Sequence, residues 1–390
     1  MLTKRERSKT MKNGKVMVFS ILLSLCMIGP AMAWNLYGTL EEWGTSPFRP
    51  YDITVLSDGS PWLTYHDELA ADWPVGKVCT IDPSDGSVTT YQVPWGNSGF
   101  ETLDRGLDDT LWIADREDRI VNFDPTTHVF TAYPLPAATF TLPAGPFGIN
   151  VASDGKVWFT CMTSNALGCY NPVTNTWQNF PVMDGGNSGK PVDIAFSSDG
   201  TVWFTTKSGG AIRGLGSLVP STGTVTLRTI DGGVDPFGIA VAGDKIWFLD
   251  HHRTVNGTLV RYDMGTGVFT YFSGIPELQD PHFLVIDPDG LIWMTAFGAS
   301  AIGTFNPFTL TFQSRAVTAN SGPMGIFLVP SGEIWWAETF ETEHGGAGRI
   351  TQPPPPDVPV PTMTGWGIVI LSSITAGFAL WAMRRKKLMG

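Results

Sequence analysis

One pattern is written seven times along this chain. Each copy has a proline, an alternating apolar run, a tight turn and a second apolar run with a tryptophan, as in residues 280–295. Two short strands joined by Asp-Gly form a β-hairpin. The repeat tryptophans lie 42 to 50 residues apart, at Trp62, Trp112, Trp158, Trp203, Trp247, Trp293 and Trp335. A strand-rich repeat of this length is typical of a propeller blade.

The remainder of each unit predicts two more strands, rich in β-branched and aromatic residues that suit a pleated surface. Four antiparallel strands in each of seven units predict an all-β, seven-bladed β-propeller over residues 34–351. The seventh unit meets four prolines at 353–356 before it can form a fourth strand. Residues 37–43 resemble an orphan fourth strand, so we predict that this N-terminal strand completes blade seven and hides an open edge.

The two ends of the chain predict export and a membrane segment. Residues 1–33 have a basic start, an apolar run and a small-x-small end, which predict a signal peptide cleaved after Ala33. Residues 352–363 form a proline-rich linker, 364–383 a transmembrane or sorting helix, and 384–390 a basic cytoplasmic tail. The ring is therefore expected outside the cell, anchored to the membrane through residues 366–383.

The C-terminal segment also resembles bacterial sorting tags of the IPTL type. The residues that carry the resemblance are 360–363 (Val-Pro-Thr-Met), Trp366-Gly367, the apolar span and the basic end. The resemblance implies a sorting or processing protease as a partner, which releases the protein to the cell surface. A plain membrane anchor is the alternative.

The charge balance excludes one class of partner. The chain has a net charge of −11, but residues 34–352 carry 15 Lys or Arg against 34 Asp or Glu, a net of −19. Such a domain repels nucleic acid and attracts cations or basic ligands. Solubility outside the cell is the simpler explanation of the same charge.

The cysteines allow two interpretations. Cys161 and Cys169 are expected on successive strands of blade three, around a turn, in a protein predicted to be exported. They form either a cross-strand disulfide or two buried thiols. Cys79 is expected to be a buried core thiol.

Antiparallel pairing places the start of each first strand and the end of each second strand at the same end of a blade. Seven blades therefore bring two sets of residues to one mouth of the central channel, where loops and strand ends bind ligands. The first set is Tyr51, Glu101, Phe147, Val192, Phe237, His282 and Met324, and the second is Tyr65, Asp115, Cys161, Thr206, Asp250, Ala296 and Glu338.

The ionisable side chains of this mouth are the candidates for chemistry. His282 is either a base or ligand, or a structural histidine. Asp115, Asp250 and Glu338 either hold a divalent ion or act as solvated loop residues and turn caps. The histidines at 251–252 are expected on the same rim, exposed. The Asp-Gly pairs at the hairpin ends are expected to be turns rather than calcium loops.

The recurring pattern Pro-x-Gly-Ile-x-Val, Asp-Gly-x-Val-Trp-Phe-Thr and Ile-Gly-x-x-Asn-Pro resembles the streptogramin B lyase (virginiamycin B lyase) family of seven-bladed propellers. Residues 146–149, 202–206 and 301–307 carry it most clearly, and the resemblance covers residues 36–351. It implies an elimination, assisted by Mg²⁺ as cofactor, that opens a cyclic depsipeptide.

The resemblance also implies roles for single positions. Tyr51 and His282 match substrate-binding residues, and Glu338 matches a metal-binding carboxylate. Met324 stands where the general-base histidine belongs, and Gly322 where the other metal carboxylate belongs. Because a thioether does not abstract a proton at neutral pH and glycine has no carboxylate, we expect the family's mechanism to be unavailable here.

Three functions remain open. The first is an exported, surface-associated propeller that binds a small molecule, a peptide or a protein partner at its mouth. The second is a Mg²⁺-dependent carbon–oxygen lyase, or an enzyme of altered chemistry, with His282 as the catalytic residue and Glu338 and Asp250 as metal ligands. The third is a protein-interaction scaffold like those built from NHL repeats.

Overall fold

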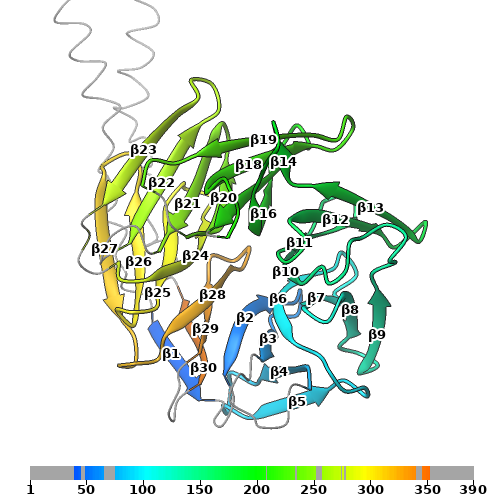
Figure 1. Cartoon of the computed structure of the whole chain (residues 1–390). Coiled ribbons are helices and arrows are strands. Elements are labelled where there is room, and N and C mark those ends of the chain that lie inside the picture. The colour runs from blue at the N-terminus through cyan, green and yellow to red at the C-terminus, as the bar shows by residue number, and fades with distance from the viewer. Residues whose placement is uncertain are drawn as a thin grey trace, which may run out of the picture. The chain divides into compact units, whose positions relative to one another are not determined.

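The seven-fold repeat folds into seven four-stranded antiparallel sheets. The described residues also form one short two-stranded hairpin. The computed structural model describes residues 39–44, 49–65, 75–207, 209–232, 235–251, 257–273, 275, 278–339 and 345–351. These residues form strands, turns and loops, with no helix among them. Figure 1 shows the sheets following one another around a ring, with the first strand of each blade nearest its centre.

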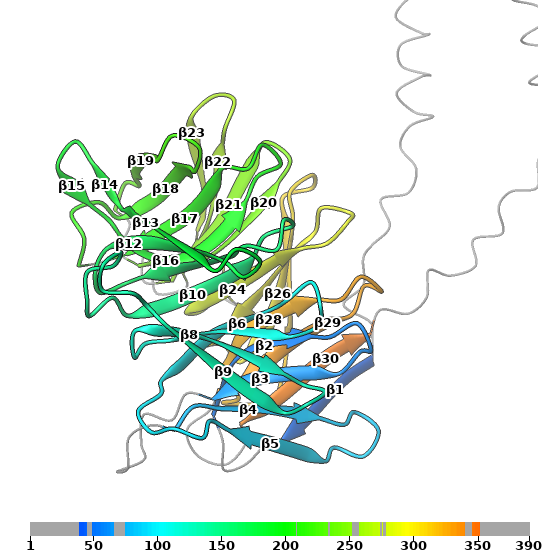
Figure 2. The same ribbon diagram turned by 90° about the vertical axis from the view of Figure 1, so that its right-hand side faces the viewer.

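In the first three blades the strands lie side by side in chain order, as Figure 2 shows for blade one. Blade one is β2 (Pro50–Val55), β3 (Pro61–Tyr65), β4 (Lys77–Ile81) and β5 (Val88–Gln92). Blade two is β6 (Phe100–Arg105), β7 (Leu111–Asp115), β8 (Arg119–Asp124) and β9 (Val129–Pro134). Blade three is β10 (Pro146–Val151), β11 (Val157–Cys161), β12 (Ala166–Asn171) and β13 (Thr176–Pro181).

The next three blades repeat this order after a hairpin of β14 (Met183–Asp184) and β15 (Asn187–Ser188). Blade four is β16 (Lys190–Phe196), β17 (Val202–Lys207), β18 (Gly214–Val219) and β19 (Thr224–Thr229). Blade five is β20 (Pro236–Ala242), β21 (Lys245–Asp250), β22 (Thr258–Asp263) and β23 (Val268–Ser273). Blade six is β24 (Pro281–Ile286), β25 (Ile292–Ala296), β26 (Ala301–Asn306) and β27 (Thr311–Ala316).

Blade seven closes the ring with a strand from the other end of the chain. It consists of β28 (Pro323–Leu328), β29 (Ile334–Glu338), β30 (Gly346–Thr351) and β1 (Thr39–Gly44). The outer strand β1 pairs antiparallel with β30, from Thr39 opposite Thr351 to Gly44 opposite Gly346 (Figure 1). The predicted closure by an N-terminal strand is therefore confirmed, over residues 39–44.

Every first strand carries an irregularity at the same place. In blade one the register shifts between Pro50 and Ile53, and the equivalent shift occurs in each of the other six blades. A β-bulge adds a residue to one strand and redirects the side chains beside it. The bulges thus fix how the two residues inside each register shift point at the channel mouth.

Buried threonines join neighbouring blades beside these bulges. The Thr64 hydroxyl, two residues after the repeat tryptophan, donates to the carbonyl oxygen of Glu101 in blade two at 2.7 Å. Equivalent bonds run to the next blade from Thr160, Thr205 and Thr295, while Thr102 on β6 and Thr339 after β29 make similar bonds from other positions. Blades two and seven have Ala114 and Ala337 at this position and bond through Thr102 and Thr339 instead, whereas blade five has Leu249, so the boundary between blades five and six is joined differently.

The repeat tryptophans form the core between blades. Trp62 packs against Phe123 of blade two with ring centroids 5.3 Å apart. Trp335 of blade seven is fully buried in a cluster with Ile53 and Ile81 of blade one. Because each blade buries its tryptophan face on the following blade, the apolar core continues around the ring.

The Asp-Gly pairs are hairpin turns, as predicted. Gly59, Gly155, Gly200 and Gly290 have φ between 79° and 88°, the left-handed region that glycine adopts without penalty. The preceding aspartates bond within their own turns; Asp58, for example, accepts the backbone N–H of Ser60 at 2.9 Å.

The disulfide predicted as one alternative does not form. Cys161 and Cys169 are free, buried thiols, and Cys161 lies opposite Ala166 while Cys169 lies opposite Trp158. Cys161 packs in the core between blades two and three, whereas Cys169 packs on the other face, against blade four. Side chains on opposite faces of one sheet cannot be bridged.

The predicted signal peptide, proline-rich linker, transmembrane helix and basic tail lie outside the described residues. Within the described part of the chain, there is no helix with the length and apolar character needed to span a membrane.

Candidate functional site

The first-strand residues predicted to ring the mouth meet as a cluster of aromatic rings. Tyr51, Phe147, Phe237 and Phe283 form a closed circuit of edge-to-face contacts, with successive centroids 6.1, 5.8, 5.2 and 6.4 Å apart. This aromatic circuit draws on blades one, three, five and six. Its rings are 4–8% exposed, so they form an apolar floor at this end of the channel. The sequence reasoning missed Phe283, which the bulge brings to the centre.

Charged side chains border the aromatic circuit. The Lys207 ammonium lies 5.8 Å from the Phe147 ring centroid and 5.6 Å from that of Phe237. Burial lowers the pKa of Lys207. Glu101 is 1% exposed and is paired with Arg116, whose Nε lies 2.6 Å from Oε1. The mouth therefore combines an apolar floor with one lysine and one ion pair.

The predicted site residue His282 lies in a second cluster, beside the aromatic circuit. Its ring centroid is 5.1 Å from that of Phe237, 5.4 Å from that of Phe297 and 4.8 Å from that of His251. The Nδ1 atom of His282 lies 3.0 Å from the backbone carbonyl oxygen of Asp280. The His251 side chain is only 10% exposed, so the predicted exposure of this histidine is wrong; its neighbour at 252 lies outside the described residues.

Two histidines and one carboxylate converge in this second cluster. Nδ1 of His251 is 2.9 Å from Oδ1 of Asp280, and one ligand atom each from His251, Asp280 and His282 lie within 4.8 Å of one another. Sequence reasoning missed Asp280 because it precedes its strand, in a loop whose position the repeat does not fix. Its presence two residues before a mouth histidine was the available clue.

The two aspartates predicted at the mouth are buried and serve the backbone. Asp115 is fully buried and accepts hydrogen bonds from the Ser98 hydroxyl and the Gly99 N–H, at 2.6 and 2.9 Å. Asp250 is also fully buried and accepts the N–H of Asp235 at 3.0 Å. Both carboxylates therefore hold the loops that lead into first strands, rather than standing as solvated loop residues.

Glu338 is the last residue of β29, in blade seven. It is 3% exposed, and its Oε1 accepts the indole N–H of Trp336 at 2.9 Å. Burial, followed by a hydrogen bond with the Glu42 carboxyl, raises the pKa of Glu338 to about 8. A carboxyl group that is protonated at neutral pH is a poor ligand for Mg²⁺.

The two positions at which the resemblance implies a carboxylate and a base hold Gly322 and Met324. Met324 is 6% exposed, and its carbonyl oxygen accepts the Thr295 hydroxyl at 2.7 Å. Gly322 has φ of +56°, and a Cβ atom there would lie 2.7 Å from Cε2 of Phe297. The space of the missing side chain is thus taken by an aromatic ring. The residues present do not fit the Mg²⁺ site that the resemblance implies.

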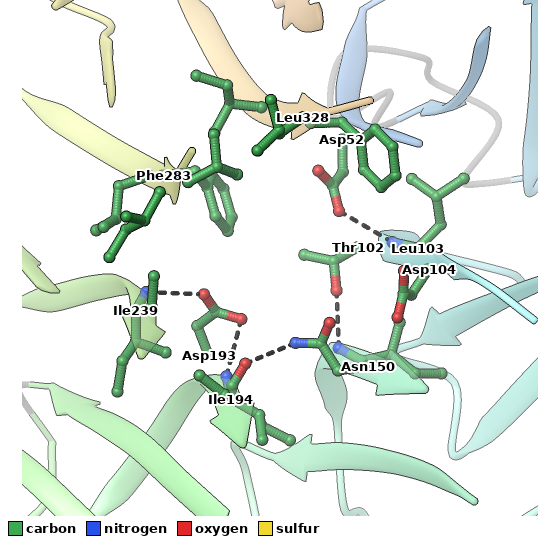
Figure 3. Close-up of a pocket in the computed structure, with 18 of the residues that line it drawn as sticks. Asp52, Thr102, Leu103, Asp104, Asn150, Asp193, Ile194, Ile239, Phe283 and Leu328 are labelled. Atoms are coloured by element: carbon green, nitrogen blue, oxygen red, sulfur yellow. Dashed lines mark hydrogen bonds between the residues drawn. The ribbon is translucent and has the colours of Figure 1, made fainter. Parts of the chain in front are cut away.

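A cavity of about 400 Å³ lies along the central channel, among the first strands. Figure 3 shows Asp52, Asp104 and Asp193 in its wall. One oxygen of each carboxylate accepts an N–H of its own strand, and the other accepts an N–H of the next blade, such as Leu103 for Asp52 at 3.0 Å. The three aspartates are therefore further joints between blades.

Burial also makes these aspartates weaker acids than exposed ones. It raises the pKa of Asp52 to about 8, that of Asp193 to about 7 and that of Asp104 to about 6, against the opposing effect of their backbone hydrogen bonds. Each keeps a proton to a higher pH than an exposed aspartate does.

Comparison with known proteins agrees with the fold and identifies the family. Residues 42–345 match the model of the virginiamycin B lyase family. A virginiamycin B lyase of Nocardia farcinica is 26% identical over 245 residues, which cover 62% of this chain and 76% of that protein.

Solved structures share the fold. A catalytically inactive variant of virginiamycin B lyase from Staphylococcus aureus, with quinupristin, superposes with a TM-score of 0.66 at 23% identity, covering 80% of this chain and 99% of that one. A streptogramin B lyase structure gives a TM-score of 0.68 at 24% identity, covering 83% of this chain and 100% of that one.

The C-terminal resemblance has a match of its own. Residues 358–385 match the IPTL-CTERM motif, which points to a C-terminal sorting tag on an exported protein.

The family model covers most of the chain and spans all seven blades, from β1 to the loop before β30. The chain therefore belongs to the virginiamycin B lyase family.

Proposed function

We propose that this protein is an exported, surface-associated binding protein that holds a small organic or peptide ligand at its channel mouth, and that it does not perform the Mg²⁺-assisted elimination. The observation that carries the proposal is the aromatic circuit, bordered by Lys207 and His282. An apolar, aromatic lining with a few fixed polar groups is typical of a ligand site.

The chemistry of the mouth defines the ligand. Ring edges and faces of Phe147 and Phe237 favour an aromatic or aliphatic body. Lys207 above these rings favours an acceptor group, such as a carbonyl or carboxylate, at one end of that body. His282 offers a second polar contact. A hydrophobic cyclic peptide has all of these features, and quinupristin, present with the Staphylococcus aureus protein, is an available probe.

The Phe297 ring disfavours the elimination. A carboxylate at position 322 and a base at position 324 are both missing, and the Phe297 ring lies where a side chain at 322 would begin. Glu338 remains, but its raised pKa disfavours metal binding at neutral pH. An enzyme that used His282 and Glu338 would need a different base from the one that the family resemblance implies.

The first test separates binding from catalysis. The full-length protein is incubated with quinupristin and Mg²⁺, ring opening is followed by mass spectrometry, and binding is followed by calorimetry in parallel with a panel of hydrophobic peptides. We expect saturable binding of a ligand of this class without ring opening. Phe147→Ala and Lys207→Ala should each weaken binding about tenfold or more, because both line the mouth.

Phe308→Ala is the matched control, because Phe308 is 84% exposed in the turn between β26 and β27. It should bind as the wild type does. Ring opening by the wild type that His282→Ala abolishes would contradict the proposal and support the altered enzyme. Absence of saturable binding to every compound would also overturn it, and a protein-interaction scaffold would then be the function to test.

A further inference from the structure

We propose that His251, Asp280 and His282 form a binding site for one divalent transition-metal ion, with Zn²⁺ the best match, at the boundary between blades five and six. This site is separate from the Mg²⁺ site implied by the family resemblance, which involves blade seven. It does not depend on the proposed organic ligand, because an ion can bind these residues in the protein alone.

The three side chains supply donor atoms of the kinds that such an ion binds. Two imidazole nitrogens and one carboxylate oxygen lie within 4.8 Å of one another, and the closest pair, Nδ1 of His251 and Oδ1 of Asp280, are 2.9 Å apart. Ligand atoms around one zinc ion are separated by roughly 3.3 Å, given metal–ligand bonds of about 2.0–2.1 Å. Small side-chain rotations would therefore bring all three onto one ion.

The contacts of the two imidazoles are of the kind seen in metal-binding histidines. A carbonyl oxygen only accepts, so the 3.0 Å contact of His282 Nδ1 with the Asp280 carbonyl places the proton on Nδ1 and a lone pair on Nε2. In His251, Nε2 faces Oδ2 of Asp235 at 3.8 Å while Nδ1 faces Asp280. A metal-bound histidine commonly directs its other ring nitrogen at a carbonyl or carboxylate in this way.

The position in the ring is also distinctive. At this boundary Leu249 replaces the threonine that joins most other blades, and the contact of His251 with Asp280 bridges blades five and six instead. Asp280 has φ of +48°, the left-handed region that few residues other than glycine adopt, directly before its strand. Both observations mark a local departure from the repeat where the three donors meet.

The choice of ion follows from the donors and their surroundings. Imidazole ligands favour Zn²⁺ and related transition ions, whereas Mg²⁺ favours oxygen donors and bound water. Three protein ligands leave at least one position for water or for a donor atom of a ligand. The rings of Phe237 and Phe297 border His282 and limit the access of solvent.

The test uses the purified full-length chain without a polyhistidine tag, treated with a chelator and desalted. It is titrated with Co²⁺, followed by visible absorption, and with Zn²⁺, followed by calorimetry. We expect one ion per chain, a Co²⁺ spectrum that Zn²⁺ removes, and no displacement by excess Mg²⁺. Binding of the organic ligand is also measured by calorimetry on the chelator-treated, desalted chain without added transition metal, so failure of one proposal does not imply failure of the other.

Variants locate the ion. His251→Ala and His282→Ala should each lower Zn²⁺ affinity by more than about 100-fold, since even outer partners of a metal site contribute about 10–100-fold. Asp280→Asn, which preserves shape, should weaken binding in a chain whose circular dichroism is unchanged. His128→Ala is the matched control, because His128 contacts Tyr91 in blade one from its turn in blade two, and it should bind as the wild type does.

Two results would overturn the proposal. One is a wild-type chain that binds neither Co²⁺ nor Zn²⁺. The other is binding that survives in His251→Ala, His282→Ala and Asp280→Asn, which would place the ion elsewhere. In either case the cluster would be a hydrogen-bonded joint that takes the place of the missing threonine.

Discussion

Single side chains decide what the mouth of this propeller can do. The Phe297 ring lies against Gly322, and the neighbouring first-strand position holds the buried Met324. The same ring borders His282 on its other side, with centroids 5.4 Å apart. One phenylalanine therefore closes the space beside Gly322 and helps to shape the cluster that we propose binds a transition metal.

The contact between Phe297 and Gly322 can be tested by stability. Gly322→Ala should lower the free energy of unfolding by about 1–3 kcal/mol, because its Cβ would be 2.7 Å from Cε2 of Phe297 and φ is +56°. Denaturant unfolding measures the change. Gly44→Ala is the control, since nothing lies within 4 Å of a Cβ there. A Gly322→Ala variant as stable as the wild type would show that the ring moves aside at no cost.

The channel aspartates make a prediction about pH. The pKa of Asp52 is about 8 in the folded chain and about 3.9 when unfolded, so the folded state binds more protons between these values. Its contribution to stability is therefore present below about pH 4 and is lost as the pH rises to about 8. Asp193 and Asp104, with pKa values of about 7 and 6, act in the same direction.

Thermal unfolding of Asp52→Asn at pH 5 and pH 8 tests this sign. The difference in Tm between the two pH values should be more positive, pH 5 minus pH 8, for the wild type than for the variant. Asp82→Asn is the control, because Ser84 hydrogen bonds lower the pKa of the exposed Asp82 and its titration lies below this range. Equal pH dependence in the wild type and Asp52→Asn would contradict the assignment.

The sequence predicted which positions reach the mouth, but not which side chains meet there. The period of the repeat fixes the second residue of each first strand, so Tyr51 and His282 were found. Phe283 reaches the centre only through the bulge, and Asp280 and Phe297 lie in loops whose course depends on tertiary packing. Whether Cys161 and Cys169 lie on the same face of the sheet depends on the register around a four-residue turn. The spacing of the cysteines alone does not give that register.

At the scale of secondary-structure elements, the threonine joints between blades recur in blades one, three, four and six. A threonine on the second strand donates to the first strand of the next blade, as from Thr205 to Phe237 at 2.6 Å and from Thr295 to Met324 at 2.7 Å. The acceptor carbonyls belong to mouth residues. The same bonds that hold blades together therefore fix the height of the side chains that form the mouth.

Replacing these threonines should weaken the ring in a graded way. Thr205→Val and Thr295→Val should each cost about 1–2 kcal/mol in the free energy of unfolding, because a buried carbonyl loses its hydroxyl partner. The two lie in separate blades, so the double variant should show nearly the sum. Thr131→Val, exposed on β9, is the control. Urea unfolding gives the values, and a double variant no weaker than either single variant would show that the joints are not independent.

The elements follow the repeat closely, with one addition. The predicted hairpins, the four strands per blade and the closing strand are all present, because alternation and Asp-Gly turns are local signals. The hairpin β14–β15 was missed, since its strands have two residues each and lack alternation. Its Gly185-Gly186 turn, with φ of +56° and +88°, was the available sign.

For the molecule as a whole, closure of the ring rests on one strand. The β1 residue Trp43 stacks on Trp335 with centroids 5.4 Å apart, and the Arg349 guanidinium lies 5.3 and 5.0 Å from the two ring centroids. The Arg349 side chain also donates from Nε to Glu41 at 3.0 Å. Stacked rings and a charged pair thus hold β1 against the last blade.

Removing the stacked ring should open this edge locally. Trp43→Ala should lower the free energy of unfolding by about 2 kcal/mol, below the ~3–5 kcal/mol for a fully buried tryptophan, since Trp43 is half-buried. Hydrogen exchange should speed up in β30, and β12 of blade three serves as the internal control. Unchanged exchange in β30 would mean that backbone pairing alone holds the strand.

This closing pair also sets the order in which the chain can finish folding. Thr39 and Thr351 are partners 312 positions apart, so the first strand to leave the ribosome pairs with the last. Until synthesis is nearly complete, β1 has no partner and blade seven has an unpaired edge. Contacts of such long sequence separation form slowly. A chain of this topology therefore spends its biogenesis as an open arc, the state in which chaperones would be most needed.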